Sequence, residues 1–343
     1  MEKVLTIIIP TYNMEKYLHR TLDSLIVSDE DMSLLEVLVI NDGSKDSSSL
    51  IGHEYEAIFP DTFRVIDKEN GNYGSCINRG LKEASGKYVK ILDADDRYDN
   101  EVFRGYLKFL KNTDVDLVIN NRTNLDDRGK VVEKYSFKLP FGVFSLKDIY
   151  GYVKTIQMHC VAIRTDNIRK IGYKQTEGIS YTDQEWMFLP VATSESLAYF
   201  DGYLYLYLTG RDGQTMDVSV RENKFWQELK VMDVSLNEYN RSEYMFNEEQ
   251  RQYLVERLVA RIASCYSVYF NVFGSDKNYQ LLVDFDKALK EKNQTVYERL
   301  NGLSVNHYHY IRHWRKHYPH KLFLCNVYRR YLGLRRNIRS LFY

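Results

Sequence analysis

Apolar runs that alternate with amphipathic stretches fill the first hundred residues, and this alternation constrains the fold more than any other feature. The runs with the length of buried strands lie at 4–9, 35–40, 63–66 and 88–92, and the stretches with helical spacing lie at 18–26 and 74–84. Strands that alternate with helices pair in parallel through right-handed crossovers, and the helices cover both faces of the sheet. We therefore predict an α/β fold with a mainly parallel sheet flanked by helices.

The pattern changes further along the chain. Strands are predicted at 116–120 and 198–208, a hairpin turn at 124–130, and long helices at 225–236, 248–270 and 279–290. We place a domain boundary near residue 216, between an α/β domain at 1–216 and a helical C-terminal domain at 217–343.

Charge is distributed unevenly along the 343 residues, although the formal net charge is zero. From Arg299 to Tyr343 the chain carries ten Lys or Arg and no Asp or Glu. Apolar residues between Val327 and Leu341 fall on one helical face, as in basic amphipathic helices that lie on anionic membranes. The alternative is a terminal helix packed on its own domain, and we favour the membrane. No nucleic-acid-binding motif accompanies the basic tail, so we expect no nucleic acid partner.

Cysteine usage and hydropathy bear on the compartment. The four cysteines form no CxxC pair, which argues against a zinc site or a disulfide framework and suits a reducing cytoplasm. No stretch has the length of a membrane span. We expect a cytoplasmic protein, which lies on the inner face of the membrane if the tail binds there.

Three carboxylates, Asp93, Asp95 and Asp96, follow the predicted strand at 88–92. Such closely spaced carboxylates repel one another unless a cation lies between them, and a divalent cation bound to a diphosphate would serve. The alternative is an acidic turn in which Asp96 or Asp99 caps the next helix. The apolar strand directly before the carboxylates favours the metal.

Two more polar segments follow predicted strands. In Asn41–Ser44, the carboxylate of Asp42 could accept the N–H of a base or the hydroxyls of a ribose, but these are also ordinary turn residues. Asn70–Ser75 contains glycines before a helix, which suits close approach to a phosphate. Its spacing matches neither a Walker nor a Rossmann motif, so a plain loop remains the alternative.

Four segments together resemble family 2 glycosyltransferases in order and spacing. They are Ile8–Asn13, Val39–Ser44, Lys68–Gly71 and Leu92–Asp96. The resemblance is specific over residues 4–100, looser to about 216 and absent beyond. It implies that residues 1–216 form an inverting, nucleotide-sugar-binding catalytic domain of the GT-A fold. The helical region would then bind acceptor, membrane or a second copy of the chain.

The resemblance also implies roles for individual residues. It assigns the donor nucleotide, most often a UDP-sugar, to Pro10, Thr11, Tyr12, Asp42, Asn70, Gly71, Asn78, Asp93 and Arg211, and the metal, Mn²⁺ or Mg²⁺, to Asp95 and Asp96. Many relatives carry a basic residue where this chain has Ile77, and Arg211 could supply that charge. The alternative to this role is that Arg211 lies in a surface turn with its side chain in solvent.

The family requires a general base, for which the resemblance points to Asp183. Thr182 replaces the glutamate usual in relatives, and Glu185 is the reserve candidate. A helix N-cap is the simpler interpretation of this segment, and both can hold at once. For His159 we favour a satisfied core histidine over a place in the acceptor cleft.

We therefore expect transfer of a sugar from a nucleotide diphosphate to a saccharide or lipid-linked acceptor in bacterial surface polysaccharide assembly. A nucleotidyltransferase would carry a glycine-rich basic loop after the first strand, where this chain has Pro10–Asn13. A non-catalytic subunit that binds nucleotide-sugar or membrane is the other alternative, because Ile77 and Thr182 depart from the family pattern. The sequence also leaves open whether the chain forms a homo-oligomer.

Overall fold

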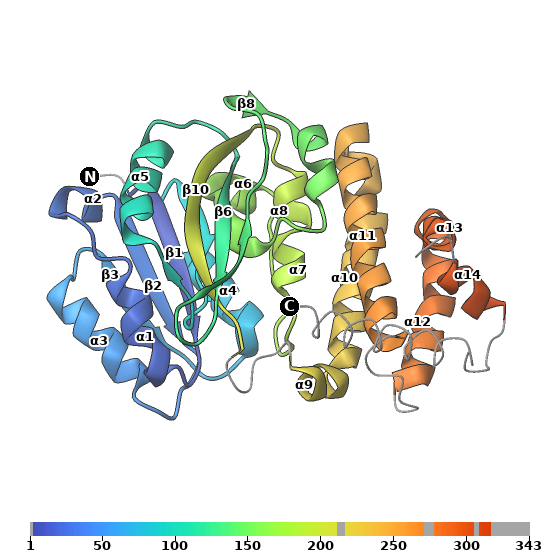
Figure 1. Ribbon diagram of the computed structural model, residues 1–343, viewed down its shortest axis with the longest axis horizontal. Helices are drawn as coiled ribbons and strands as arrows, with labels where there is room; N and C mark the ends of the chain where they lie inside the picture. Colours follow the sequence, from blue (N-terminus) through green and yellow to red (C-terminus); the bar gives the residue numbers. More distant parts are fainter. Residues whose placement is uncertain (1–2, 211–216, 271–277, 305–308, 317–343) are drawn as a thin grey trace, which may run out of the picture. The chain divides into compact units, whose positions relative to one another are not determined.

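Apolar runs of the N-terminal part form the strands of a sheet that is covered on both faces. The structure, a computed structural model, describes residues 3–210, 217–270, 278–304 and 309–316 (Figure 1). The chain divides into two compact units, Met1–Asp212 and Gly213–Tyr343. The domain boundary that we expect near residue 216 lies outside the described residues.

The described part of the first unit contains a mixed ten-stranded sheet. Its strands are β1 (Leu5–Thr11), β2 (Leu35–Asn41), β3 (Phe63–Asp67), β4 (Tyr88–Ile91), β5 (Arg97–Tyr98), β6 (Leu117–Leu125), β7 (Val131–Tyr135), β8 (Val143–Phe144), β9 (Val161–Arg164) and β10 (Leu197–Leu208). Strands β3, β2, β1 and β4 are parallel neighbours, followed in order by β9, β6, β10 and β5. β9 is antiparallel to both of its neighbours, whereas β6 and β10 are parallel to each other.

The expected α/β class is confirmed; helices join the four parallel strands β1 to β4, and the sheet is mixed because β9 runs antiparallel to β4 and β6. Parallel neighbours need such a crossover, whereas a short turn produces an antiparallel pair. The hairpin predicted at 124–130 is confirmed, and it joins β6 to β7 antiparallel.

Helices cover both faces of the sheet (Figure 1). They are α1 (Glu15–Asp23), α2 (Asp29–Met32), α3 (Ser48–Ile58), α4 (Asn72–Glu83), α5 (Asn100–Lys111), α6 (Thr165–Lys170), α7 (Asp183–Trp186) and α8 (Leu189–Ala192), with the 3-10 helices η1 (Leu146–Tyr152) and η2 (Met158–Cys160). Leu5, Ile7 and Ile9 share a core with apolar residues of α1, α3 and α5. Ile8 points to the opposite face, where a Cβ added to Gly80 of α4 would lie 2.6 Å from its side chain.

Strand β1 continues past Pro10 to Thr11, although the proline predicts an end there. The pairing with β4 stops at Ile8, so that β1 pairs only with β2 beyond this point. A proline is tolerated in a strand where one side lacks a ladder partner. The extended backbone therefore reaches the sheet edge, and Tyr12 follows directly.

The described part of the second unit is helical, as predicted. Its elements are α9 (Val218–Asn223), α10 (Phe225–Ser242), η3 (Glu243–Met245), α11 (Glu248–Val268), α12 (Tyr279–Lys292), α13 (Gln294–Gly302) and α14 (Tyr310–Arg315). α11 begins at a capping box formed by Asn247 and Gln250. α10 packs against α11 and α12, and a buried ion pair of 2.6 Å joins Arg315 to Asp286.

The basic segment expected to form an amphipathic helix at 327–341 lies outside the described residues. Among the residues that are described, no helix combines the length and the apolar character that crossing a bilayer requires.

Candidate active site

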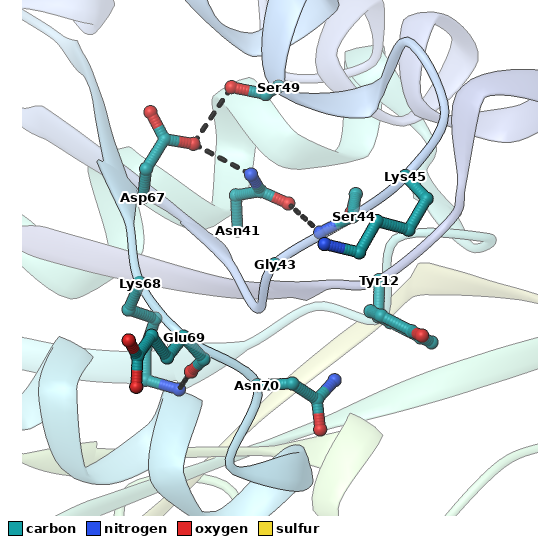
Figure 2. Close-up of a pocket in the computed structure, with 10 residues that line it drawn as sticks. All are labelled: Tyr12, Asn41, Gly43, Ser44, Lys45, Ser49, Asp67, Lys68, Glu69 and Asn70. Carbon is teal, nitrogen blue, oxygen red and sulfur yellow. Dashed lines mark hydrogen bonds between the residues drawn. The ribbon is translucent and has the colours of Figure 1, made fainter.

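Four parallel strands end at one edge of the sheet, and the residues that follow them form the candidate site. β1 ends at Thr11, β2 at Asn41, β3 at Asp67 and β4 at Ile91. Ligands of open α/β sheets bind at this edge, beyond the carboxyl ends of the strands. A pocket of about 610 Å³ lies there (Figure 2). It is lined by Tyr12, Asn41, Gly43, Ser44, Lys45, Ser49, Asp67, Lys68, Glu69 and Asn70.

The pocket combines one aromatic ring with fixed polar groups (Figure 2). Tyr12 is 46% exposed, so that its ring can stack on a ligand. Asp67 accepts hydrogen bonds from Asn41 Nδ2 at 2.7 Å and from Ser49 Oγ at 2.8 Å. An aromatic face beside oriented amide and carboxylate groups suits a nucleoside.

Asp67 also binds a histidine outside the pocket lining. His53 Nε2 lies 2.9 Å from Asp67 Oδ2, and His53 Nδ1 lies 2.7 Å from Glu56. The hydrogen bond with Asp67, followed by that with Glu56, raises the pKa of His53. Desolvation opposes ionisation of Asp67, but hydrogen bonds from Asn41 and His53 outweigh it and lower the pKa of this carboxyl. The carboxylate of Asp67, which lines the pocket, is therefore ionised near neutral pH.

Asp42, which we expect to face the base, is only 3% exposed and does not line the pocket. Its Oδ1 accepts from Lys68 Nζ at 2.5 Å and from the backbone N–H of Gly71 at 2.9 Å. Asn70 Nδ2 donates to the backbone carbonyl of Asp42 at 2.9 Å. Asp42 thus orders the turn after β3, and Lys68 contributes to the pocket lining.

A second cluster follows β4, where Asp93 and Asp96 meet His159 of η2. One potential ligand atom of each residue lies within 4.8 Å of the other two. Asp96 is 1% exposed and accepts from Tyr205 Oη at 2.8 Å and from the backbone N–H of Leu208 at 2.7 Å. His159 is 8% exposed, and its Nδ1 has no hydrogen-bond partner among the described residues.

Burial controls protonation in this cluster of Asp93, Asp96 and His159. Desolvation, reinforced by the neighbouring aspartates, raises the pKa of Asp96 well above its usual value. Desolvation, reinforced by the charges of Arg122 and Lys90, lowers the pKa of His159, so that its imidazole is neutral at pH 7. Crowded carboxylates and a neutral imidazole nitrogen without a partner fit a divalent cation.

The structure bears on two expectations at this cluster and overturns one of them. Asp95, expected as a metal ligand, is not part of the trio; Arg20 Nη2 donates to its backbone carbonyl at 3.1 Å. A metal role for Asp95 stays a prediction. His159 is buried as expected, but the expectation of a satisfied side chain is wrong, because its Nδ1 has no acceptor or donor among the described residues.

Asp183 begins α7 and is partly exposed. Its Oδ2 accepts from Gln184 Nε2 at 2.5 Å. The buried hydroxyl of Tyr73 donates to Asp93 Oδ1 at 2.9 Å. Burial, followed by the charges of Asp93 and Asp183, raises the pKa of Tyr73, which places both carboxylates near this tyrosine.

The loop 175–182, which leads into α7, is attached to α4. Asn78 Oδ1 accepts from the backbone N–H of Gln175 at 2.8 Å, and Asn78 Nδ2 donates to the Gln175 carbonyl at 2.8 Å. At Gly74, an added Cβ would lie 1.9 Å from the carbonyl oxygen of Thr176. Asn78, expected to bind the donor, therefore holds this loop and does not line the pocket.

Glu185, the reserve candidate for the base, is buried and stabilises the same loop. Its Oε2 accepts from the backbone N–H of Thr176 at 2.7 Å. Thr182 is also buried, and its Oγ1 accepts from Gln175 Nε2 at 2.9 Å. The partly exposed Asp183 is therefore better placed than Glu185 to exchange a proton with a ligand.

Sequence reasoning alone missed Lys68, Tyr73 and Tyr205. Lys68 is the first residue of the motif Lys68–Gly71, and Tyr205 lies in the strand predicted at 198–208, but the sequence does not indicate the partner of either residue. Arg211, predicted to contact the diphosphate, lies outside the described residues.

Comparisons with known proteins show which family and which fold this chain resembles. Residues 6–172 match the family model described as glycosyl transferase family 2. The minor teichoic acid biosynthesis protein GgaB of Bacillus subtilis is 25% identical over 68% of this chain and 26% of its own length. The poly(ribitol-phosphate) beta-N-acetylglucosaminyltransferase TarS of Staphylococcus aureus is 24% identical over 67% of this chain and 40% of its own length. The chain thus spans less than half of either relative.

A solved structure has a similar fold. Residues 1–349 of S. aureus TarS, in complex with UDP-GlcNAc, superimpose with a TM-score of 0.68 and 21% sequence identity. The match covers 85% of this chain and 82% of that structure, which confirms the expected architecture of a sheet domain followed by a helical region.

Proposed function

Because the chain belongs, through residues 6–172, to glycosyl transferase family 2, as its four motifs predict, we propose that it transfers a sugar from a nucleotide diphosphate to an acceptor hydroxyl. The observation that carries this proposal is the shared edge of the sheet. The pocket beside Tyr12 and the cluster of Asp93 and Asp96 both follow the carboxyl ends of its parallel strands. A nucleoside would occupy the pocket, and its diphosphate would reach the carboxylate cluster.

For the donor we propose a UDP-sugar, supported by the UDP-GlcNAc named for the TarS structure. The ring of Tyr12 would stack on the base, with the backbone at Pro10 and Thr11 beside it. Asp42 and Gly71 would shape the turn that brings Asn70 to the pocket.

We assign a divalent cation, Mn²⁺ or Mg²⁺, to Asp93, Asp96 and His159, with Asp95 as an alternative carboxylate. When bound, the cation would neutralise charge on the leaving diphosphate. The hydroxyl of Tyr205 orients the Asp96 carboxylate. Asp93 is oriented in the same way by Tyr73.

Asp183 is our candidate for the general base. The acceptor oxygen would attack the anomeric carbon while its proton passes to Asp183, and the bond between that carbon and the diphosphate oxygen would break with inversion. The attachment of the preceding loop through Asn78 and Glu185 would hold the carboxylate in position. A rigidly positioned base contributes about 10²- to 10⁴-fold to such a reaction.

The acceptor is a saccharide or lipid-linked surface polymer in this proposal. The names of GgaB and TarS, which refer to teichoic acid and poly(ribitol-phosphate), support an acceptor of bacterial surface polymer assembly. The basic segment from Arg299 to Tyr343 would bring the chain to an anionic membrane surface, where such acceptors are assembled.

The first experiment is a calorimetric titration with UDP, with and without Mn²⁺, on the native chain and on Asp96→Asn. Asp166→Asn is the matched control, because the side chain of Asp166 is 85% exposed. We expect metal-dependent binding that Asp96→Asn weakens and Asp166→Asn preserves. Absence of UDP binding to the native chain would contradict the donor assignment.

Turnover of UDP-sugars is measured next, on the native chain and on Asp183→Asn. We expect Asp183→Asn to keep UDP affinity and to lose about 10²- to 10⁴-fold in rate. A native chain that binds UDP but turns over no UDP-sugar, with or without candidate acceptors, would instead support the non-catalytic subunit that Ile77 and Thr182 leave open.

A further inference from the structure

Arg122 on β6 is a buried cation that the described residues leave incompletely satisfied. Arg122 is 5% exposed, and its Nη1 donates a hydrogen bond to Gln157 Oε1 at 2.7 Å. Its Nε is buried without an acceptor, and no carboxylate among the described residues forms an ion pair with it. An arginine keeps its charge in any protein environment, so this burial is unfavourable until an acceptor is present.

The second unit shows how this chain otherwise satisfies a buried arginine. The Arg315 side chain, also 5% exposed, binds the carboxylate of Asp286 through both Nε and Nη2. Arg122 instead has the ring faces of Tyr135 and Tyr207, 4.2 and 5.7 Å from its Cζ. Cation–π contacts and a hydrogen bond with Tyr135 offset part of the cost of burial but leave Nε without an acceptor among the described residues.

Arg122 lies beside the carboxylate cluster of the candidate site. The register between β6 and β10 places it opposite Tyr205, whose hydroxyl donates to that cluster. Gln157, its hydrogen-bond partner, is the N-cap of η2, which carries His159. The ring of Tyr207 lies 5.0 Å from the ring of His159 and also contacts Arg122.

We propose that Arg122, together with Gln157, binds a phosphate group at the edge of the cluster formed by Asp93, Asp96 and His159. The planar fork of an arginine matches the spacing of phosphate oxygens, and an anion would supply the acceptor that Nε lacks. This inference rests on the proposed function, and it names two sources of the same chemistry. The phosphate belongs either to the diphosphate of the donor or to a phosphate group of the acceptor polymer.

The first test needs neither donor nor acceptor. Thermal unfolding is followed in sodium phosphate and in sodium chloride of matched ionic strength, for the native chain, Arg122→Gln and Arg64→Gln. Arg64 is the matched control, because its side chain is 45% exposed and pairs with Glu83 at the surface. We expect phosphate to raise the Tm of the native chain and of Arg64→Gln but not of Arg122→Gln. Equal stabilisation of all three proteins would overturn the proposal.

A second variant covers the case in which Arg122→Gln does not fold. Arg122→Lys keeps the charge but lacks the planar fork, and we expect it to bind phosphate about tenfold more weakly than the native chain. If Arg122→Lys bound phosphate as tightly as the native chain does, recognition by the planar guanidinium group would be contradicted.

Calorimetry then separates the two sources, using UDP, uridine, and glycerol 3-phosphate in the presence of UDP. If the donor supplies the phosphate, Arg122→Lys loses about 10- to 100-fold in UDP affinity and keeps its uridine affinity. If the acceptor supplies it, UDP affinity is unchanged and glycerol 3-phosphate binding is lost. Unchanged affinity for all three ligands would refute the site.

These results are distinguishable from a failure of the proposed function. A native chain that binds inorganic phosphate through Arg122 but does not bind UDP would support the phosphate site and refute the UDP donor.

Discussion

Gly74 on α4 offers a direct test of how the loop 175–182 positions the candidate base. Glycine to alanine within a helix ordinarily stabilises a protein by about 0.5–1 kcal/mol. At Gly74, however, the new Cβ would lie 1.9 Å from the carbonyl oxygen of Thr176 and 2.8 Å from its carbonyl carbon. Real Cβ contacts essentially never fall below 3.0 Å, so the loop backbone must move.

The size of this movement sets the expected effect. The Thr176 carbonyl must retreat by about 1 Å, and a displacement of that size at a reacting group can reduce a rate about 100-fold. That factor corresponds to about 2.7 kcal/mol of transition-state stabilisation. Overpacking would also lower the free energy of unfolding by about 1–3 kcal/mol.

The assay measures turnover of a UDP-sugar, UDP affinity and thermal unfolding for Gly74→Ala. We expect turnover to fall while UDP affinity is retained, because Gly74 does not line the pocket. Gly105→Ala on α5 is the control; its Cβ would have Phe200 Cζ at 3.8 Å as its nearest neighbour. This variant should keep its activity and gain about 0.5–1 kcal/mol of stability.

Two results would refute this reasoning. Native turnover in Gly74→Ala would mean that the loop accepts a methyl group without moving the base, or that Asp183 is not the base. Loss of UDP affinity without loss of turnover at saturating donor would place the disturbance in the pocket beside Tyr12 instead.

Four further predictions address other parts of the site. Lys68→Met should lower the free energy of unfolding in urea by about 3 kcal/mol, because it leaves the Asp42 carboxylate buried without a cation; an unchanged midpoint would contradict this. Tyr12→Ala should weaken UDP binding by about 1–3 kcal/mol through lost stacking, as measured by calorimetry. His159→Ala should weaken Mn²⁺ binding about tenfold or more, followed by the electron paramagnetic resonance of free Mn²⁺. Burial lowers the pKa of Lys90 from 10.5 to about 7, so the unfolded chain binds one more proton between these values. Stability should therefore rise with pH across this window by about 1.4 kcal/mol per unit, and Lys90→Met should lose that slope in urea titrations.

Local sequence patterns determined the four parallel strands β1 to β4 and the places where they end. Each of these four strands is a short apolar run followed by polar residues, as in Asn41–Ser44 or Asp93–Asp96. Parallel crossovers bring such ends to one edge, so the neighbourhood of the pocket beside Tyr12 and the carboxylates was predictable. The family motifs lie in these same turns, which is why residues 4–100 identified the family.

Contacts between distant segments were decided only by the tertiary structure. The sequence predicts a core histidine at His159 but not its neighbours, and only η2 packing against β4 brings it to Asp93 and Asp96. Arg122 lies among polar residues just beyond the strand predicted at 116–120, and the missing acceptor of its Nε becomes visible only when β10 and η2 surround it. Hydrophobic periodicity specifies which face of an element is buried, whereas the partner that a buried polar group meets there depends on packing and register across the whole domain.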